Sequence, residues 1–231
     1  MTTRLQERLD RLYGIGGGVG ANRPALSQAE QEAHDLVAGW MREDGLEVEV
    51  DPIGNLWGRL PGGLDGPEVW TGSHLDSVPQ GGRLDGALGV LAGVEALGRL
   101  RARGGRRRTL AVVAFRDEEG WRFDGGFLGS RALTGRLAPG ALEARDADGV
   151  SVREALVRLG LDPDPPRAGW VAVVPAAYVE LHVEQGPRLA TADVPLGVVT
   201  SITGMAGYDV VFEATGGHAG TVPMATRADA L

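Results

Sequence analysis

The sequence Gly72-Ser-His-Leu-Asp-Ser77, with Leu84-Asp-Gly86 a few residues later, joins a predicted strand to a predicted helix. The strand covers residues 68–73 and the helix covers residues 85–103. A second strand follows at residues 110–115, where a nearly continuous apolar run is typical of burial on both faces of a sheet. Strand, helix and strand in this order predict an α/β fold with a largely parallel or mixed sheet.

The rest of the chain extends this pattern in both directions. Residues 46–50, 55–60 and 178–183 have the composition of strands, and residues 1–14, 27–44, 127–137 and 151–159 are predicted helices. Ser27 with Glu30, and Ser151 with Glu154, have the form of capping boxes that open two of these helices. The character of the sequence changes after about residue 200, and residues 208–214 predict an edge strand in a second, smaller domain.

The composition favours a globular protein that acts on small molecules. The chain has 231 residues, a formal charge of −8 and a pI near 5.1, which argues against a general nucleic-acid binder. It contains no Cys, so a metal site must be built from His, Asp and Glu. Membrane spans need roughly 20 apolar residues, which no segment approaches, and the N-terminus lacks the apolar core of a signal peptide. We therefore predict a cytoplasmic protein without nucleic-acid or membrane partners.

His74, Asp76 and Asp85 have the spacing of a hydrolytic metal site. Residues i and i+2 share one side of an extended segment, so Asp76 can hold the second ring nitrogen of His74 and fix the tautomer that binds metal. Asp85, at the start of a helix, is then free to bind one ion or to bridge two. A histidine at a strand end is more often structural than a ligand, and the two carboxylates are what favour the metal site.

Further candidates follow later in the chain. Glu118 and Glu119 come after a buried strand; one can bind metal while the other acts as general base, although a solvated acidic loop is the alternative. His182 is a further candidate ligand. His218 lies in a glycine-rich loop, where a structural and a functional role are equally open, and His34 is predicted to be structural or solvated. Donors of these types fit Zn²⁺, Mn²⁺, Co²⁺ or Ni²⁺.

Five ordered motifs carry a resemblance to a known family. They are Gly72-Ser-His-Leu-Asp-Ser-Val-Pro79 with Gly81-Gly-Arg-Leu-Asp-Gly86, Glu118-Glu-Gly-Trp-Arg-Phe123, Leu128-Gly-Ser-Arg131, Glu180-Leu-His-Val-Glu-Gln-Gly-Pro187 and Gly217-His-Ala-Gly-Thr-Val-Pro-Met224. Together they resemble the M20 metallopeptidase-like amidohydrolases, in the branch of N-carbamoyl-L-amino acid hydrolases and allantoate amidohydrolases. The resemblance implies a three-layer α/β sandwich with a mixed, mainly parallel central sheet over residues 1–202. Residues 203–231 would then begin a smaller α+β lid or dimerisation domain.

The resemblance also implies a role for each candidate. It implies four ligands for two divalent metal ions (Zn²⁺, Mn²⁺, Co²⁺ or Ni²⁺): His74, Asp85 as the bridge, Glu119 and His182. Glu118 would be the base that deprotonates the attacking water, and Asp76 would support catalysis through His74. Gln185 resembles a residue that contacts substrate. His218 corresponds to a lid histidine that, in the family homodimer, reaches the partner subunit's site, contacts substrate and stabilises the oxyanion.

The implied reaction is hydrolysis of the carbamoyl C–N bond of an N-carbamoyl-L-amino acid, a linear non-peptide amide. A histidine at position 182 is typical of the carbamoylase-like branch, whereas peptidase relatives often have an acidic residue there. The alternatives are an allantoate amidohydrolase and an M20 peptidase or deacylase. A catalytically inactive, truncated fragment is a further alternative, because family members continue to a last histidine ligand that is not found before Leu231.

Overall fold

The computed structural model describes residues 3–162, 174–204, 206–228 and 230. The chain divides into two compact units, Met1–Gln185 and Gly186–Leu231. The domain boundary predicted from the sequence, after residue 202, stays a prediction.

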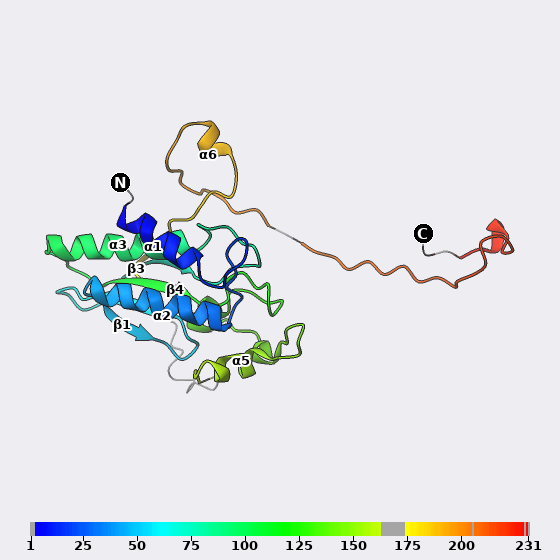
Figure 1. The fold of residues 1–231 in the computed structure, drawn as a ribbon, viewed down its shortest axis with the longest axis horizontal. Coiled ribbons are helices and arrows are strands. Elements are labelled where there is room, and N and C mark those ends of the chain that lie inside the picture. The colour runs from blue at the N-terminus through cyan, green and yellow to red at the C-terminus, as the bar shows by residue number, and fades with distance from the viewer. Residues whose placement is uncertain (1–2, 163–173, 205, 229, 231) are drawn as a thin grey trace. The chain divides into compact units, whose positions relative to one another are not determined.

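The first unit is built on a five-stranded mixed sheet (Figure 1). Its strands, in the order β1-β2-β4-β3-β5, are β1 (Glu47–Val50), β2 (Leu56–Leu60), β4 (Leu110–Phe115), β3 (Val69–His74) and β5 (Ala177–Val179). β3 runs parallel to β4 and β5, whereas β2 runs antiparallel to β1 and β4. His74 pairs with Phe115 in the register, so the carboxyl ends of β3 and β4 are neighbours.

Helices cover both faces of this sheet. One face packs against α1 (Arg4–Tyr13), α2 (Gln28–Glu43) and α3 (Ala87–Arg103) and forms the main core with Val112 and Ala114 of β4. The alternate residues, Ala111 and Val113, face a second apolar cluster to which Leu133 of α4 (Leu128–Leu133) contributes. α5 (Val152–Arg158) belongs to a third cluster. The α/β sandwich is therefore confirmed, and β4 is buried on both faces as its apolar run predicts.

Among the described residues, no helix has both the length and the apolar character that crossing a bilayer requires.

Helix α2 begins at its predicted cap, but Glu30 departs from the capping box. The Ser27 hydroxyl accepts the backbone N–H of Glu30 at 3.2 Å, as expected. The Glu30 carboxylate, however, accepts the N–H of Leu26 at 2.6 Å instead of that of Ser27. It also pairs with the buried Arg116 guanidinium at 2.9 Å. A charged partner in the interior outweighs one local backbone bond, whereas the capping box of α5 is complete.

The buried Glu30 carboxylate leads to a prediction about acid stability. Burial raises the pKa of Glu30, but the charge of Arg116 and the nearby His34 outweigh this effect and lower the pKa from 4.5 to about 2. Because the folded-state pKa is the lower one, the stabilisation is complete above pH 4.5 and is lost as the pH falls toward 2. We expect Glu30→Gln to lower the free energy of unfolding by about 3 kcal/mol at neutral pH.

The difference between Glu30→Gln and the wild type should shrink as the pH approaches 2. Urea unfolding at stepped pH measures it. A difference that stays constant between neutral and acidic pH would contradict an ionised Glu30.

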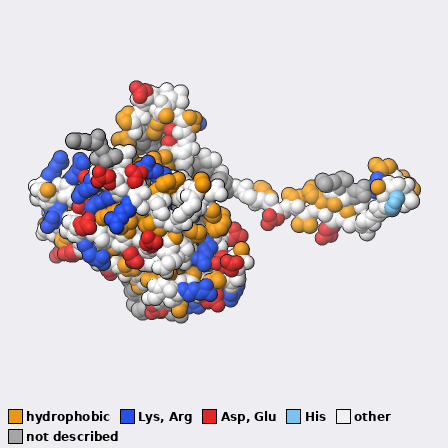
Figure 2. Space-filling view, in the orientation of Figure 1, with side chains coloured by type: hydrophobic (Ala, Val, Ile, Leu, Met, Phe, Trp, Pro, Cys, Tyr) orange, Lys and Arg blue, Asp and Glu red, His pale blue; other side chains and the backbone are white. Residues whose placement is uncertain are grey.

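The second unit has little regular structure. It contains the short helix α6 (Arg188–Thr191) and a 3₁₀ turn at Met224–Thr226. The edge strand predicted at residues 208–214 is wrong, because this segment pairs with no strand in the part of the chain that the structure describes. Tyr208, Val210 and Phe212 are 87%, 69% and 66% exposed, and apolar side chains line the segment in Figure 2. Alternating residues form a strand only when a neighbouring strand completes the hydrogen bonds.

Candidate metal centre

The carboxyl ends of β3 and β4 bring the first candidates together. His74 is the last residue of β3, and Glu118 and Glu119 lie just beyond β4. Asp76 connects the two loops, because its carboxylate accepts the backbone N–H groups of Glu118 at 3.2 Å and Glu119 at 3.1 Å. Functional residues gather at this edge of open α/β sheets.

Asp76 contacts the Nδ1 side of the His74 ring. Its Nδ1 lies 3.1 Å from the Asp76 carbonyl oxygen and 3.4 Å from Asp76 Oδ1, and both residues are buried. Asp76 therefore lies where the sequence places it, with its backbone oxygen as the nearer partner. A proton on Nδ1 would leave Nε2 free to bind a metal ion. That Nε2 lies 3.6 Å from Glu118 Oε2 and 3.9 Å from Asp85 Oδ1.

Asp85 owes its position to the glycine that follows it. Gly86 has a φ of 63° and stands at the start of α3. A Cβ at this position would lie 2.6 Å from the His74 ring atoms Nδ1 and Cε1. Only glycine therefore allows the backbone to pass so close to His74, and this contact brings the Asp85 carboxylate to the ring.

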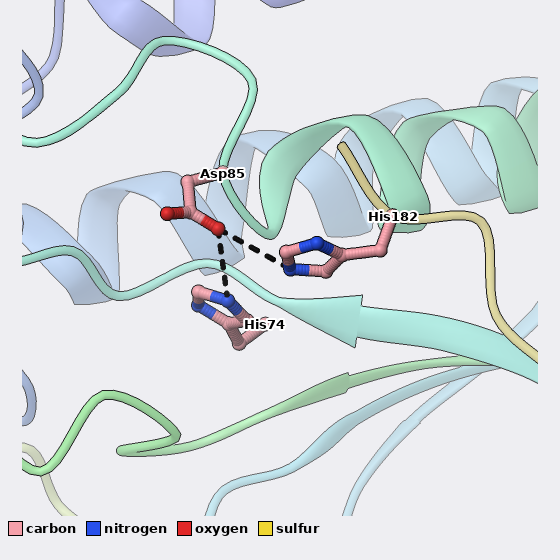
Figure 3. Close-up of side chains that lie close together, drawn as sticks. All are labelled: His74, Asp85 and His182. Carbon is pink, nitrogen blue, oxygen red and sulfur yellow. Dashed lines mark ion pairs between the residues drawn. The ribbon is translucent and has the colours of Figure 1, made fainter. Parts of the chain in front are cut away.

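His74, Asp85 and His182 form a group of three converging donors (Figure 3). Their ligand atoms all lie within 4.8 Å of one another, and His182 Nε2 is 3.3 Å from Asp85 Oδ1. His182 was predicted within a strand, but β5 ends at Val179, and a contact of 2.8 Å between Nδ1 and the Val183 carbonyl oxygen orients the ring instead. Two imidazole nitrogens and a carboxylate oxygen fit Zn²⁺, Mn²⁺, Co²⁺ or Ni²⁺.

Gln185 supports the group in a way that the sequence did not indicate. Its side-chain amide donates to Asp85 Oδ2 at 2.7 Å, which leaves Oδ1 facing the two histidines. Outer partners of this kind orient metal ligands. The substrate contact predicted for Gln185 stays a prediction.

The electrostatics of the site favour a cation. Burial lowers the pKa of His74, but the hydrogen bond and charge of Asp76, with the charges of Glu118 and Glu119, raise it to about 9. Burial also raises the pKa of Glu118 and of Glu119, against the opposing charge of His74. The carboxylates around His74 therefore place negative charge at its ring, which a divalent ion would neutralise.

Glu119 stands apart from the three-donor group. Its backbone is fixed by Asp76, yet its carboxylate is not among the converging atoms. Its predicted role as a ligand stays a prediction, as does the role of Glu118 as base.

The other two histidines differ in their surroundings. His218 belongs to the second unit, where its Nδ1 accepts the backbone N–H of Gly220 at 3.1 Å, and its predicted role stays a prediction. His34 is buried in the first unit, 3.6 Å from Glu30. It is therefore structural and not solvated.

Two further features beside the site had no signal in the sequence. A cavity of about 370 Å³ next to Glu118 has mainly apolar walls, which include Trp70, Phe115, Phe127 and Tyr178. Its walls come from separate segments, so no local motif could indicate it. Asp117 is buried before Glu118, and burial with the charges of Asp76 and Glu30 raises the pKa of Asp117 to about 7.

The chain is similar to known proteins. Peptidase family M20/M25/M40 matches residues 70–229. The chain is 47% identical over 235 residues to an N-carbamoyl-L-amino acid amidohydrolase from Geobacillus stearothermophilus, an alignment that covers 99% of this chain and 57% of that relative. It is 38% identical to an allantoate deiminase from Arabidopsis thaliana, over 97% of this chain and 45% of the relative.

A solved structure is also similar to this chain. An amidase of the hydantoinase/carbamoylase family from Burkholderia ambifaria superposes with a TM-score of 0.78 at 36% identity, over 97% of this chain and 55% of that one. The chain thus spans about half the length of these relatives. Because the family match extends over more than half of its residues, the chain belongs to Peptidase family M20/M25/M40.

Proposed function

We propose that this protein is a metal-dependent amidohydrolase that cleaves the carbamoyl C–N bond of an N-carbamoyl-L-amino acid. Water is consumed, and the free amino acid, CO₂ and ammonia are released. The convergence of His74, Asp85 and His182 beside Glu118 carries the proposal. The relative that is 47% identical and named for this activity supports the choice of substrate.

His74, Asp85 and His182 would hold one divalent ion, and Asp85 and Glu119 would help to hold a second. When bound, such ions polarise the substrate carbonyl and lower the pKa of water. Glu118 takes the proton of the attacking water and returns it to the leaving nitrogen. The raised pKa of Glu118 suits a group that must hold this proton between the two transfers.

Two more residues complete the proposed reaction. Gln185, which is exposed, orients Asp85 through its bond to Oδ2 and is proposed to contact the substrate. His218 would donate to the oxyanion across the subunit boundary of a homodimer, as a preplaced donor does in acyl transfer.

Hydrolysis of allantoate is the second candidate. The relative from Arabidopsis thaliana that is 38% identical is named for this activity. Allantoate also carries carbamoyl C–N bonds, so the same base and the same ligand set would serve. The two candidates therefore differ in the group that is bound beside the carbamoyl carbon.

Release of ammonia from the carbamoyl compounds and allantoate, and of free amino acids from a dipeptide, by the metal-loaded chain tests the proposal. The substrates are N-carbamoyl-L-amino acids with small, aliphatic and aromatic side chains, their D-enantiomers, allantoate and a dipeptide. We expect release from the L-carbamoyl compounds, none from the D-enantiomers, and none after chelation of the metal. Turnover of allantoate or the dipeptide without turnover of any carbamoyl amino acid would contradict the proposed substrate.

A further inference from the structure

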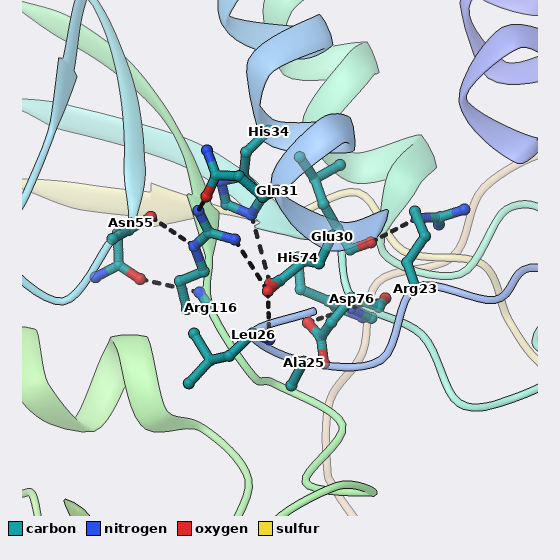
Figure 4. Close-up of polar contacts among 12 residues, drawn as sticks. Arg23, Ala25, Leu26, Glu30, Gln31, His34, Asn55, His74, Asp76 and Arg116 are labelled. Atoms are coloured by element: carbon teal, nitrogen blue, oxygen red, sulfur yellow. Dashed lines mark hydrogen bonds and ion pairs between the residues drawn. The ribbon is translucent and has the colours of Figure 1, made fainter. Parts of the chain in front are cut away.

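Figure 4 shows the buried ion pair of Glu30 and Arg116 together with His74 and Asp76. Arg116, which directly follows β4, is 1% exposed, and Glu30 of α2 is 0% exposed. Arg116 Nη1 lies 2.9 Å from Glu30 Oε2. The low pKa of Glu30 shows that this pair is ionised in the folded protein.

Three hydrogen bonds hold Arg116 in place in addition to its ion pair. Its Nε donates to the Gly54 carbonyl at 2.9 Å, and its Nη2 donates to Gln31 Oε1 at 2.6 Å. Its backbone N–H donates to Asn55 Oδ1 at 3.0 Å. The guanidinium therefore joins α2 to the loop before β2 and fixes the end of β4 from the side.

The turn that follows Arg116 carries both glutamates of the site. Asp117 has a φ of 50°, in the left-handed region that a residue with a Cβ adopts at a cost. Such a conformation persists only where the surroundings hold it. Here Glu118 and Glu119 donate their N–H groups to Asp76, and Arg116 fixes the chain immediately before the turn.

We propose that Arg116, held by Glu30, is a positioning residue for the metal centre. The buried pair fixes the start of the turn at residues 117–119, so that Glu118 faces His74 and the backbone N–H groups of Glu118 and Glu119 hold Asp76 beside the His74 ring. This inference rests on the proposed function, since it takes His74, Asp85 and His182 as metal ligands.

Stability alone does not account for this pair. Bringing two charges into the interior is costly, and apolar residues of similar size often replace a buried ion pair without loss of stability. The forked guanidinium, however, reaches Gly54, Gln31 and Glu30 at once, which an apolar side chain cannot do. Removing both charges together therefore separates the contribution of the pair to stability from its role in positioning the metal centre.

The test measures Co²⁺ binding and unfolding in parallel on the full chain. Arg116→Met leaves Glu30 unpaired and should lower the unfolding midpoint, whereas the double variant Glu30→Leu with Arg116→Met should recover it. We expect the recovered double variant to bind Co²⁺ 10- to 100-fold more weakly than the wild type, with an altered visible absorption band of the bound ion. Arg116→Lys keeps the positive charge but not the forked guanidinium. Its Co²⁺ affinity should therefore lie between that of the double variant and that of the wild type.

The part-buried pair of Arg8 and Asp44, at 2.7 Å and away from the metal centre, is the control. Arg8→Met with Asp44→Leu should leave Co²⁺ affinity and the absorption band unchanged. Unchanged affinity and an unchanged band in the folded Glu30→Leu/Arg116→Met double variant would overturn the positioning role. A wild-type chain that binds no Co²⁺ would overturn the metal centre itself, so the two failures are distinguishable. If the double variant does not fold, the Co²⁺ affinity and absorption band of Arg116→Lys are compared with those of the wild type instead.

Discussion

Replacing Asp85 by alanine is expected to weaken Zn²⁺ binding on the order of 1,000-fold, beyond the 10- to 100-fold typical of residues that only orient a ligand. Asp85 is the one carboxylate of the three-donor group, with Oδ1 3.3 Å from His182 Nε2 and 3.9 Å from His74 Nε2. Its loss removes both a ligand and the negative charge that draws the cation. Competition with a chromophoric chelator at neutral pH measures the affinity.

Asp146→Ala provides the control for Asp85→Ala. Asp146 pairs with Arg122 at 3.0 Å outside the three-donor group, so its loss removes a carboxylate without removing a candidate ligand. We expect this variant to bind Zn²⁺ as the wild type does. Equal affinity in Asp85→Ala and in the wild type would mean that the group is not a metal centre.

Glu118→Gln is expected to lower turnover of N-carbamoyl-L-amino acids about 1,000-fold and to leave the metal content intact. The amide keeps the shape of the carboxylate but cannot accept the proton of the attacking water. Glu118 Oε2 lies 3.6 Å from His74 Nε2, close enough to serve water bound beside that ring. Ammonia release and elemental analysis of the same sample give both quantities.

Glu68→Gln is the matched control for Glu118→Gln, because Glu68 precedes the amino end of β3 and binds Arg59 and Trp70 instead of the site. It should leave both turnover and metal content unchanged. Loss of metal from Glu118→Gln would instead assign Glu118 as a ligand. Unchanged turnover would exclude it as the base.

The ends of β3 and β4 could be predicted from the sequence because local patterns determine them. The apolar run at residues 110–115 is typical of a buried strand, and a helix that connects two neighbouring strands of one sheet makes them parallel. Parallel strands bring their carboxyl ends together, so His74 and Glu118 had to lie near one another. Asp76 followed from the two-residue period of extended backbone.

Contacts between distant segments could not be predicted in this way. Gln185 and Asp85 are 100 residues apart, and nothing in either segment indicates their bond. The sequence around Glu30 predicts a capping box with Ser27. The Glu30 carboxylate instead pairs with Arg116, which follows β4 and is distant in sequence. Residues 208–214 have the apolar and polar pattern of a strand, but this pattern does not provide the neighbouring strand that pairing requires.

Diffraction from crystals soaked in Zn²⁺, recorded at the zinc absorption edge, tests the metal centre most directly. We predict an anomalous peak about 2.0–2.2 Å from His74 Nε2, Asp85 Oδ1 and His182 Nε2. The Gln185 amide should remain on Asp85 Oδ2. A zinc ion bound only elsewhere, with these three atoms still in contact with one another, would contradict the account.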